Sequence, residues 1–387
     1  MVAIRRKGKH NMNLLVVGTD FSPYSGGIGT YTKELATSLA QKNRVIVLAN
    51  GISNPQSFDR GRPYHIIRTP SLPVLRQLSF LIYIPWILRR YHIDAVLHVV
   101  WTTALISHLW HCLMPVPYFV SIHGSECHDD TLTWRRRLKG FLKKRRLAAL
   151  QKAKGIFPVS NYSARLVMSL GVEKERIEVI SNGVDVQRFK PSASNGNSDE
   201  QKRLLTVARL DLHKGHDRVL EALAILKSQG ITPRYTIVGQ GDEEDRLRKM
   251  SQILGLENQV EFTGFISGNQ LPHIYNSCDV YVMASREIPG RLDLIEGFGI
   301  SFLEASASGL PVVAGDSGGV SDAVQHGKTG ILVDPNNPED IASAIKRLLT
   351  DKDLVRQLGN EGRRWTETEM SWEHVARRKV SAMQRMM

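Results

Sequence analysis

Short apolar runs alternate with amphipathic segments along almost the whole chain. Residues 13–20 (NLLVVGTD) predict a buried strand, and residues 30–40 predict the amphipathic helix that follows it. The same pattern predicts strands at residues 44–49, 65–68, 94–99, 118–122, 155–159 and 178–180, with helices at residues 78–90, 102–113 and 162–170. Continuous Val, Ile and Leu strands separated by helices are typical of a parallel sheet covered on both faces.

The alternation stops at residues 190–201 (KPSASNGNSDEQ), which are mostly small or polar and predict a flexible connection. After this connection, strands are predicted at residues 204–207, 235–238, 260–262, 280–284, 311–314 and 330–333. The chain is therefore predicted to be α/β, with two doubly wound domains at residues 1–187 and 188–370 and a helix at residues 371–387. Because ligands of such sheets bind at the carboxyl ends of the strands, we expect the site in the cleft between the domains.

Composition agrees with a folded enzyme-sized protein of 387 residues, 42% of them hydrophobic and 23% charged. Three widely spaced cysteines cannot form a disulfide framework or a four-cysteine zinc site, and they fit a reducing compartment. The longest apolar run, residues 78–88, is short for a membrane span and contains Pro85. The basic N-terminus has no apolar stretch directly behind it, so we expect no signal peptide and a cytoplasmic location.

Positive charge is concentrated in the first half of the chain. Residues 1–187 hold 26 Lys and Arg against 11 Asp and Glu, whereas residues 188–387 hold 25 against 27. Residues 132–154 alone hold ten basic residues and no acidic one. Such asymmetry indicates an anionic partner for the first half, either a membrane surface or a nucleic acid.

The basic segment at residues 134–150 (WRRRLKGFLKKRRLAAL) has the pattern of a helix that lies on an anionic membrane, with an apolar face surrounded by cations. Its predicted membrane-binding residues are Trp134, Arg135, Arg136, Arg137, Lys143 and Lys144. Residues 78–90 supply a candidate second apolar contact. The alternative is an ordinary helix that packs one face on its own sheet. The chain shows no nucleic-acid-binding motif, so nucleic acid is disfavoured.

Gly26-Gly27-Ile28-Gly29 stands between a predicted strand and the start of a predicted helix. Glycines at this place let the backbone approach a ligand closely, and a helix N-terminus favours an anion. The spacing is not the dinucleotide fingerprint, and Ala49-Asn50 stands where that fingerprint needs an acidic residue. A tight turn is the alternative interpretation.

Glu296 and Glu304 give the strongest chemical signal. They lie eight residues apart in EGFGISFLEASASGLPVVAG, on either side of a glycine turn and the first turns of a helix. The backbone N–H groups of residues 298–300 would lie at that helix N-terminus, which suits a diphosphate or a sugar.

Two further candidates follow predicted strands. Arg209 and Lys214 (RLDLHK) can clamp a pyrophosphate and neutralise charge on a leaving group, although such a stretch can equally be a solvated loop. His123, in HGSE, follows the strand at residues 118–122 and is expected to face the cleft. A single histidine can also be purely structural.

Together these motifs resemble the retaining glycosyltransferases of family 4, which have the GT-B fold, over nearly the whole chain. The resemblance is carried by Gly26-Gly27-Ile28-Gly29, His123-Gly124, Asn182-Gly183-Val184-Asp185, Arg209 with Lys214, Val238-Gly239-Gln240-Gly241, Thr263-Gly264-Phe265, Glu296 with Glu304, and Gly318-Gly319. It implies an N-terminal acceptor-binding domain, a C-terminal nucleotide-sugar-binding domain, and a last helix that crosses back to the N-terminal domain.

The resemblance also implies roles for individual residues. His123, Arg209, Lys214 and Glu296 would be catalytic; Gly27, Gly264, Phe265, Phe298, Gly299, Ile300 and Glu304 would bind the donor. Within these groups, Arg209 and Lys214 would hold the pyrophosphate, and Glu304 the ribose hydroxyls. Transfer would retain configuration by attack on the face that the diphosphate leaves, so no glycosidase-like carboxylate pair is needed. No metal or other cofactor is expected, because the only Asp-x-Asp, at residues 351–353, is predicted on a helical surface.

Shorter sequence features indicate which donor and which acceptor are favoured. Residues 285–293 (SREIPGRLD) and the GDSGG string are most similar to mannosyltransferases that modify phosphatidylinositol mannosides. This favours GDP-mannose and a lipid-linked or glycan acceptor at the inner face of the cell membrane. Asp322 stands where the family often has glutamate. The alternatives are a UDP-sugar donor with a small soluble acceptor, a non-catalytic sugar-nucleotide-binding protein and, least favoured, an NAD-dependent oxidoreductase.

Overall fold

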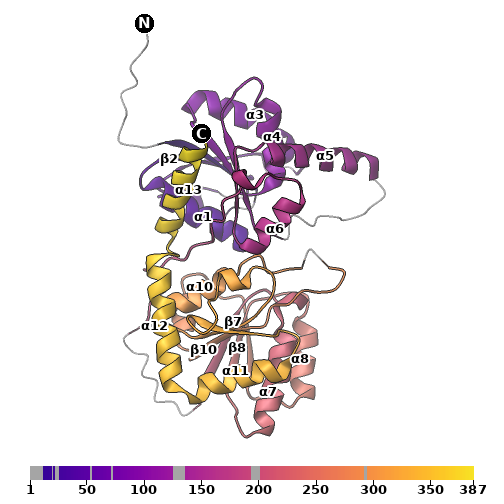
Figure 1. Cartoon of the computed structure of the whole chain (residues 1–387), viewed down its shortest axis with the longest axis vertical. Helices are drawn as coiled ribbons and strands as arrows, with labels where there is room; N and C mark the ends of the chain where they lie inside the picture. The colour runs from indigo at the N-terminus through magenta and orange to yellow at the C-terminus, as the bar shows by residue number, and fades with distance from the viewer. Residues whose placement is uncertain are drawn as a thin grey trace. The chain divides into compact units, whose positions relative to one another are not determined.

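The chain folds into two compact units, shown in Figure 1. The N-terminal unit comprises Met1–Ile180 with Trp372–Met387, and the C-terminal unit comprises Ser181–Ser371. The computed structural model describes residues 12–19, 21, 26–52, 55–70, 73–124, 136–192, 201–291 and 294–387.

The N-terminal unit is built on a parallel six-stranded sheet with the order β3-β2-β1-β4-β5-β6. Its strands are β1 (Asn13–Gly18), β2 (Arg44–Ala49), β3 (His65–Arg68), β4 (Ala95–His98), β5 (Tyr118–Ile122) and β6 (Gly155–Pro158). Its helices are α1 (Gly27–Ala40), α2 (Gln56–Asp59), α3 (Pro73–Tyr91), α4 (Ala104–Trp110), α5 (Arg136–Lys152), α6 (Asn161–Ser169) and α13 (Trp372–Met386), with 3-10 turns η1 (Trp101–Thr103) and η3 (Lys174–Arg176).

The C-terminal unit repeats this topology in a second parallel sheet of six strands, with the order β12-β11-β10-β7-β8-β9. Its strands are β7 (Arg203–Val207), β8 (Arg234–Val238), β9 (Val260–Gly264), β10 (Val280–Met283), β11 (Val312–Gly315) and β12 (Gly330–Val333). Its helices are α7 (His216–Ser228), α8 (Glu244–Ile253), α9 (Leu271–Asn276), α10 (Ile300–Ala307), α11 (Pro338–Thr350) and α12 (Lys352–Thr368), with 3-10 turns η4 (Leu212–Lys214) and η5 (Val320–Asp322).

The inner strands of both sheets are buried on both faces, as their unbroken apolar sequences predicted. Strand residues such as Leu15, Ile46 and Val96 form the core of the N-terminal unit with side chains of the covering helices. In the C-terminal unit, α7 and α11 pack side by side over the sheet, and Leu223 and Ile345 join its core. The structure therefore confirms the α/β class and the two doubly wound sheets.

The last helix, α13, belongs to the N-terminal unit, where it packs against α1 and β6. Figure 1 shows it in yellow beside the indigo α1. Trp372, Val375 and Ala376 are buried on its inner face. Its return to the first half of the chain agrees with the topology that the resemblance implied.

Two predicted elements differ from the structure. Residues 178–180, predicted as a strand, form no named strand, although Glu178 and Ile180 donate backbone hydrogen bonds to Ile156 and Pro158 beside β6. The helix predicted at residues 102–113 is divided into η1 and the shorter α4. In both places, an apolar run does not show which backbone N–H and C=O groups form the repeating hydrogen bonds of a strand or an α-helix.

Candidate functional site

The carboxyl ends of β7 and β10 form the switch point of the C-terminal sheet. These strands are neighbours, but the chain leads from β7 to β8 and β9 on one side and from β10 to β11 and β12 on the other. Loops that leave in opposite directions open a crevice, which is the usual ligand site of such sheets. The loop after β7 carries Arg209 and Lys214, and the loop after β10 leads to Glu296.

Lys214 and Glu296 form an ion pair between these two loops. Their side chains are only 15% and 12% exposed. Burial alone would raise the pKa of the Glu296 carboxyl, but the Lys214 ammonium and the backbone N–H of Phe298 hold that pKa below its usual value. The switch point therefore holds an ionised carboxylate, next to an ammonium whose other N–H groups can bind a second anion.

Two glycines with positive φ shape the chain around Glu296. Gly299, with φ 90°, is the N-cap of α10, and it has no side chain to cap the helix. Gly318, with φ 58°, approaches so closely that a Cβ there would lie 2.4 Å from the Glu296 carbonyl oxygen. The neighbouring Gly319 donates its N–H to that oxygen at 2.8 Å. The paired glycines thus hold the backbone that presents Glu296.

Phe298 and Ile300 flank Gly299 at the start of α10. Phe298 is only 2% exposed, so its side chain does not face a ligand. Ile300 is the first residue of the helix, where backbone N–H groups carry the positive end of the helix dipole. This arrangement is suited to an anion or a sugar hydroxyl beside Glu296.

Glu304 is held on α10 by a tyrosine that the sequence did not single out. The Tyr275 hydroxyl donates to Glu304 Oε2 at 2.8 Å, and the Tyr281 hydroxyl donates to Ser301 Oγ at 2.8 Å. The two rings stack with centroids 5.9 Å apart, and both are buried. Their positions in α9 and β10 look like ordinary core positions in the sequence, so their hydroxyl contacts could not be predicted.

Arg209 lies at the surface of the loop after β7. Its side chain is 71% exposed, and its guanidinium pairs with Asp211 at 2.8 Å. Gly264 and Phe265 lie where β9 ends, and the Phe265 side chain is 61% exposed. The structure thus brings Lys214 and Glu296 into contact and leaves an arginine and an aromatic ring exposed at strand ends of the same sheet.

A buried ion pair between Asp217 and Arg286 supports these loops and was missed in the sequence. The two guanidinium nitrogens of Arg286 lie 2.7 and 2.8 Å from the two carboxylate oxygens of Asp217. Burial tends to raise the pKa of Asp217, but Arg286 outweighs it and holds the pKa below its usual value. The Arg286 backbone N–H also donates to the His213 carbonyl at 2.8 Å, so the loop after β10 is joined to the turn that ends at Lys214. These partners lie 69 residues apart, and no local pattern links them.

His213 and His216 flank Lys214 but are not candidates for acid–base catalysis. Burial lowers the pKa of each imidazole to about 4, with a further contribution from Lys214. His216 Nε2 lies 3.2 Å from the Arg209 carbonyl oxygen. Both rings are therefore neutral near pH 7 and serve to pack the loop.

In the N-terminal unit, His123 follows β5 and is partly buried. Its Nε2 lies 3.1 Å from the Val99 carbonyl oxygen, and its ring meets the edge of Tyr31 with centroids 4.6 Å apart. Gly27, the first residue of α1, is exposed, and a Cβ there would meet no atom within 4 Å. Because β1, β4 and β5 are consecutive in the sheet, α1, Val99 and His123 follow neighbouring carboxyl ends.

Tyr31 connects His123 to a buried lysine on the last helix. The Tyr31 hydroxyl lies 2.9 Å from Ser121 Oγ, which in turn lies 3.3 Å from Lys379 Nζ. Lys379 is fully buried, and its ammonium position lies 4.6 Å from the centre of the Phe157 ring. Burial lowers the pKa of this amine to about 7. Nothing in the local sequence marked Lys379 as buried.

The predicted membrane helix is present as α5 from Arg136 onward. Trp134 and Arg135 lie outside the described residues, as do the side chains of Arg136, Arg137 and Lys143. Lys144 is exposed. At the other end of α5, Ala149 and Leu150 are buried, and the Tyr118 hydroxyl donates to the Ala149 carbonyl at 2.7 Å. The C-terminal part of the helix therefore packs on its own sheet.

The Asp-x-Asp sequence has a local structural role. Asp351 caps α12 by accepting the Leu354 N–H at 2.9 Å, and Asp353 is 89% exposed and pairs with Arg356. Within the described parts of the chain, no helix is both long and apolar enough to span a membrane.

Two family profiles match the chain in succession. Residues 25–188 match "Glycosyltransferase Family 4", and residues 187–365 match "Glycosyl transferases group 1". The first covers the strand ends that carry Gly27 and His123, and the second covers the crevice with Lys214 and Glu296.

Curated relatives are similar over nearly the full chain. A GDP-mannose-dependent α-(1-6)-phosphatidylinositol monomannoside mannosyltransferase of Mycobacterium tuberculosis is 30% identical over 94% of this chain and 96% of its own length. A GDP-mannose-dependent monoacylated α-(1-6)-phosphatidylinositol monomannoside mannosyltransferase of Corynebacterium glutamicum is 27% identical over 96% and 97%.

Solved structures share the fold at lower identity. Sucrose-phosphate synthase of Thermosynechococcus elongatus superposes with a TM-score of 0.80 at 21% identity, over 97% of this chain and 98% of that one. Anabaena Alr3699/HepE, in complex with UDP, gives 0.78 at 19% identity, over 97% and 100%. These likenesses confirm the predicted GT-B architecture.

Proposed function

The chain belongs to glycosyltransferase family 4, and we propose that it transfers a mannosyl group from GDP-mannose to a hydroxyl group of a lipid-linked acceptor. The observation that carries the proposal is the Lys214–Glu296 ion pair at the switch point between β7 and β10. GDP-mannose and a lipid acceptor are favoured because the mycobacterial and corynebacterial relatives are named for both.

The donor would lie across the carboxyl ends of β7 to β10. Lys214 and the exposed Arg209 would bind its diphosphate, since both supply N–H donors and positive charge. The Glu304 carboxylate, fixed by Tyr275, would accept hydrogen bonds from the ribose hydroxyls. Gly264 and the exposed ring of Phe265 would contact the base.

The sugar would lie beside Glu296 and the start of α10. The ionised Glu296 carboxylate can accept hydrogen bonds from sugar hydroxyls while it still orients Lys214. The backbone N–H groups of Gly299 and Ile300 can donate to the sugar or to the diphosphate, whereas that of Phe298 bonds to Glu296. His123 and Gly27 of the N-terminal unit would contact the sugar and the phosphates or acceptor.

Transfer would proceed with retention. The bond between the anomeric carbon and the diphosphate oxygen breaks while the acceptor oxygen forms a bond on the same face, and a phosphate oxygen takes the acceptor proton. Negative charge grows on the departing GDP, so the ammonium of Lys214 would stabilise the transition state more than the bound donor. This is the reason to expect an effect of Lys214 on turnover.

The acceptor would be reached at a membrane surface. The exposed Lys144 and the basic composition of α5 would attract an anionic leaflet, where a phosphatidylinositol-type acceptor resides. The buried end of α5 would keep the helix attached to the N-terminal sheet.

The test is a transfer assay with GDP-mannose, UDP-glucose, UDP-GlcNAc and ADP-glucose, each offered with phosphatidylinositol mannosides in mixed micelles. We expect turnover with GDP-mannose alone and a product whose new linkage is α by NMR, as in the donor. Turnover with a UDP-sugar would overturn the donor, and a β-linked product would overturn retention. Binding of one of the four without hydrolysis or transfer would support the non-catalytic sugar-nucleotide-binding protein.

A further inference from the structure

We infer that the outer face of α3 and α4 is a lipid-docking site, and that the groove between these helices holds an acyl chain of an anionic phospholipid. The inference rests on the proposed function only in placing the acceptor in a membrane. It assigns the apolar contact to α3 and α4, whereas the sequence placed the main contact on the basic α5.

The outer face of α3 is apolar although it is exposed. Leu78, Ile82 and Trp86 follow one another at intervals of four residues, which places them in one stripe along the helix. Their exposed fractions are 56%, 71% and 49%. The opposite face of α3 supplies Phe80, Ile84 and Ile87 to the core, so the outer stripe is not needed to hold the helix in place.

The end of α4, a helix that packs against α3, also exposes apolar side chains. Leu109 is 50% exposed and Leu113, just beyond the helix, is 71% exposed. The indole N–H of Trp110 donates to the Leu81 carbonyl at 3.1 Å and fixes α4 beside α3. Large exposed apolar side chains gathered on adjacent helices usually mark an interaction surface.

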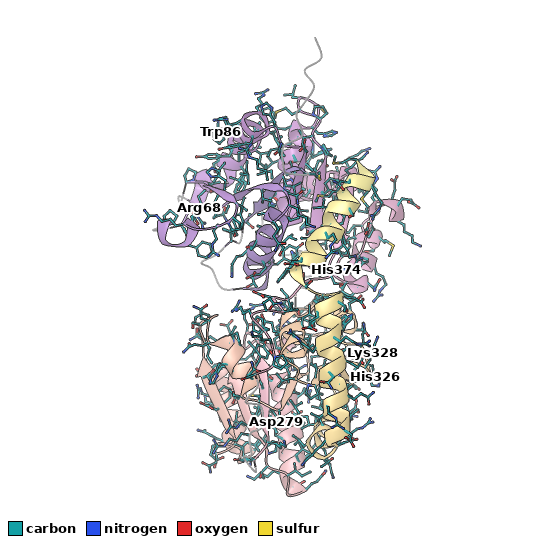
Figure 2. The ribbon with its side chains drawn as sticks, turned by 90° about the vertical axis from the view of Figure 1, so that its left-hand side faces the viewer. Arg68, Trp86, Asp279, His326, Lys328 and His374 are labelled. Carbon is teal, nitrogen blue, oxygen red and sulfur yellow. The ribbon has the colours of Figure 1, made fainter. Side chains whose placement is uncertain are left out.

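A groove of about 540 Å³ lies within this surface. It is lined by Leu81, Ile82, Pro85, Trp86, Arg89, Arg90 and Trp110. The exposed lining is mainly apolar, and its volume is in the range of about 300–1,000 Å³ usual for small-molecule sites. Trp86 lies at the outer edge of the N-terminal unit in Figure 2, with Trp110 forming part of the lining of the same groove.

The charge at the groove selects an anionic lipid over a neutral apolar partner. Arg89 and Arg90 are exposed, and neither forms an ion pair with another described residue. The sequences of α3 and α4 contain no Asp or Glu. Two arginines at the end of an apolar stripe match a headgroup phosphate above an acyl chain, and tryptophan is favoured at that same interface.

Neighbouring basic residues extend the positive field. α5 packs against α4, and Arg145 and Lys152 lie near enough to His108 to lower the pKa of its imidazole, after the larger effect of burial. A protein partner would also cover apolar side chains, but it would have to neutralise cations from both α3 and α5. A membrane with anionic lipids does both at once.

The experiment measures flotation of the full chain with vesicles of phosphatidylcholine alone or mixed with phosphatidylinositol. Ile82→Asp combined with Leu113→Asp should lower partitioning to the anionic vesicles at least about tenfold, because each change replaces an apolar side chain that the membrane would bury with a negative charge. The matched control is Ile253→Asp on α8, also exposed at 85%, which should bind like the wild type.

A second variant and a second measurement distinguish lipid binding in the groove from non-specific binding to vesicles. Arg89→Ser with Arg90→Ser should remove the preference for phosphatidylinositol while the protein stays folded. Brominated acyl chains should quench the fluorescence of Trp86. This quenching is measured as the difference between the wild type and Trp86→Phe. Retained binding by the aspartate variant, equal binding to neutral vesicles, or no Trp86 quenching would each overturn the inference.

Failure of the docking site can be distinguished from failure of the proposed reaction. Donor hydrolysis in solution should be unchanged in the aspartate variant, while Lys214→Ala should lose turnover and still float with vesicles. If light scattering shows a dimer that Ile82→Asp separates, and vesicles do not bind, the face joins two copies of the chain and the lipid site is overturned.

Discussion

At Lys214, one ammonium would serve two partners, the carboxylate of Glu296 in the structure and the diphosphate in the proposed reaction. The Glu296 charge keeps the ammonium in place within a site where both side chains are largely shielded from water. A fixed charge of this kind stabilises developing negative charge without reorganisation during the reaction. Its contribution should therefore appear in the transition state.

Lys214→Ala should reduce kcat about 100- to 1,000-fold and change donor KM less than tenfold. The reason is that the leaving GDP carries more charge in the transition state than in the bound donor. Steady-state kinetics with saturating acceptor test this, with the exposed Lys249→Ala on α8 as the matched control. Equal losses in kcat and in donor affinity would make Lys214 a binding residue only.

Glu304→Ala should weaken GDP binding about tenfold or more, because hydrogen bonds to a charged group contribute about 1.5–3 kcal/mol. Calorimetry with GDP and with its 2′,3′-dideoxyribose analogue isolates the ribose contact. The wild type should prefer GDP, and the variant should bind both ligands alike. A variant that keeps the full preference would contradict the ribose assignment.

At the scale of elements, the loop after β10 is held by its own ion pair before any ligand binds. Asp217 at the start of α7 and Arg286 after β10 are both largely buried, with side-chain exposure of 10% and 7%. Because the loop continues to Glu296, this pair fixes where the loop begins and the ion pair with Lys214 fixes its other end. The residues that shape the site are thus partly outside the motifs that identified it.

Arg286→Met should destabilise the C-terminal unit by about 3–5 kcal/mol, because it leaves the Asp217 charge buried without its main partner. The combined change Arg286→Met with Asp217→Leu should recover much of that loss, since no charge then remains unpaired. Urea unfolding measures both variants. Arg248→Met, at an exposed pair with Glu244 on α8, is the control and should change stability by less than about 1 kcal/mol.

At the scale of the whole molecule, the end of the chain completes the first unit. α13 places Lys379 against Ser121, 258 residues earlier in the sequence. Its amine faces Tyr31 and Phe157, and the nearest charges are Arg378 and Glu178. A lysine in this setting is more easily deprotonated than in water.

Lys379 should therefore make stability depend on pH. The folded chain releases this proton near pH 7, whereas the unfolded chain keeps it until about pH 10.5. Between these values the unfolded state binds more protons, so this group raises the free energy of unfolding with pH, by at most about 1.4 kcal/mol per unit. Below pH 7 the full cost of burying the charge remains.

Lys379→Met should be more stable than the wild type at pH 6, and this advantage should shrink as the pH rises toward 10. Thermal unfolding across that range measures the difference. Lys42→Met, an exposed lysine between α1 and β2, should show a difference that does not vary with pH. A constant difference for Lys379→Met as well would mean that Lys379 stays protonated when buried.

The sequence determined the class of the fold and marked residues of the candidate site. Continuous apolar strands must be covered on both faces, so their alternation with helices required parallel sheets, and the structure has two of them. Lys214, Glu296, Gly299 and Glu304 were identifiable because each lies within a few residues of a strand end or a helix start. Those are short-range relations that a linear pattern records.

The tertiary structure decided which of these residues meet and what supports them. The Lys214–Glu296 contact and the Asp217–Arg286 pair join segments that follow β7 and β10, two strands that are neighbours only in the folded sheet. The Tyr275–Glu304 bond joins α9 to α10, the helices before and after β10. The tertiary structure also decided that Lys379 is buried and that Leu78 and Ile82 are exposed. Burial depends on which surfaces the folded sheet covers, and hydropathy along the chain records only what each side chain prefers.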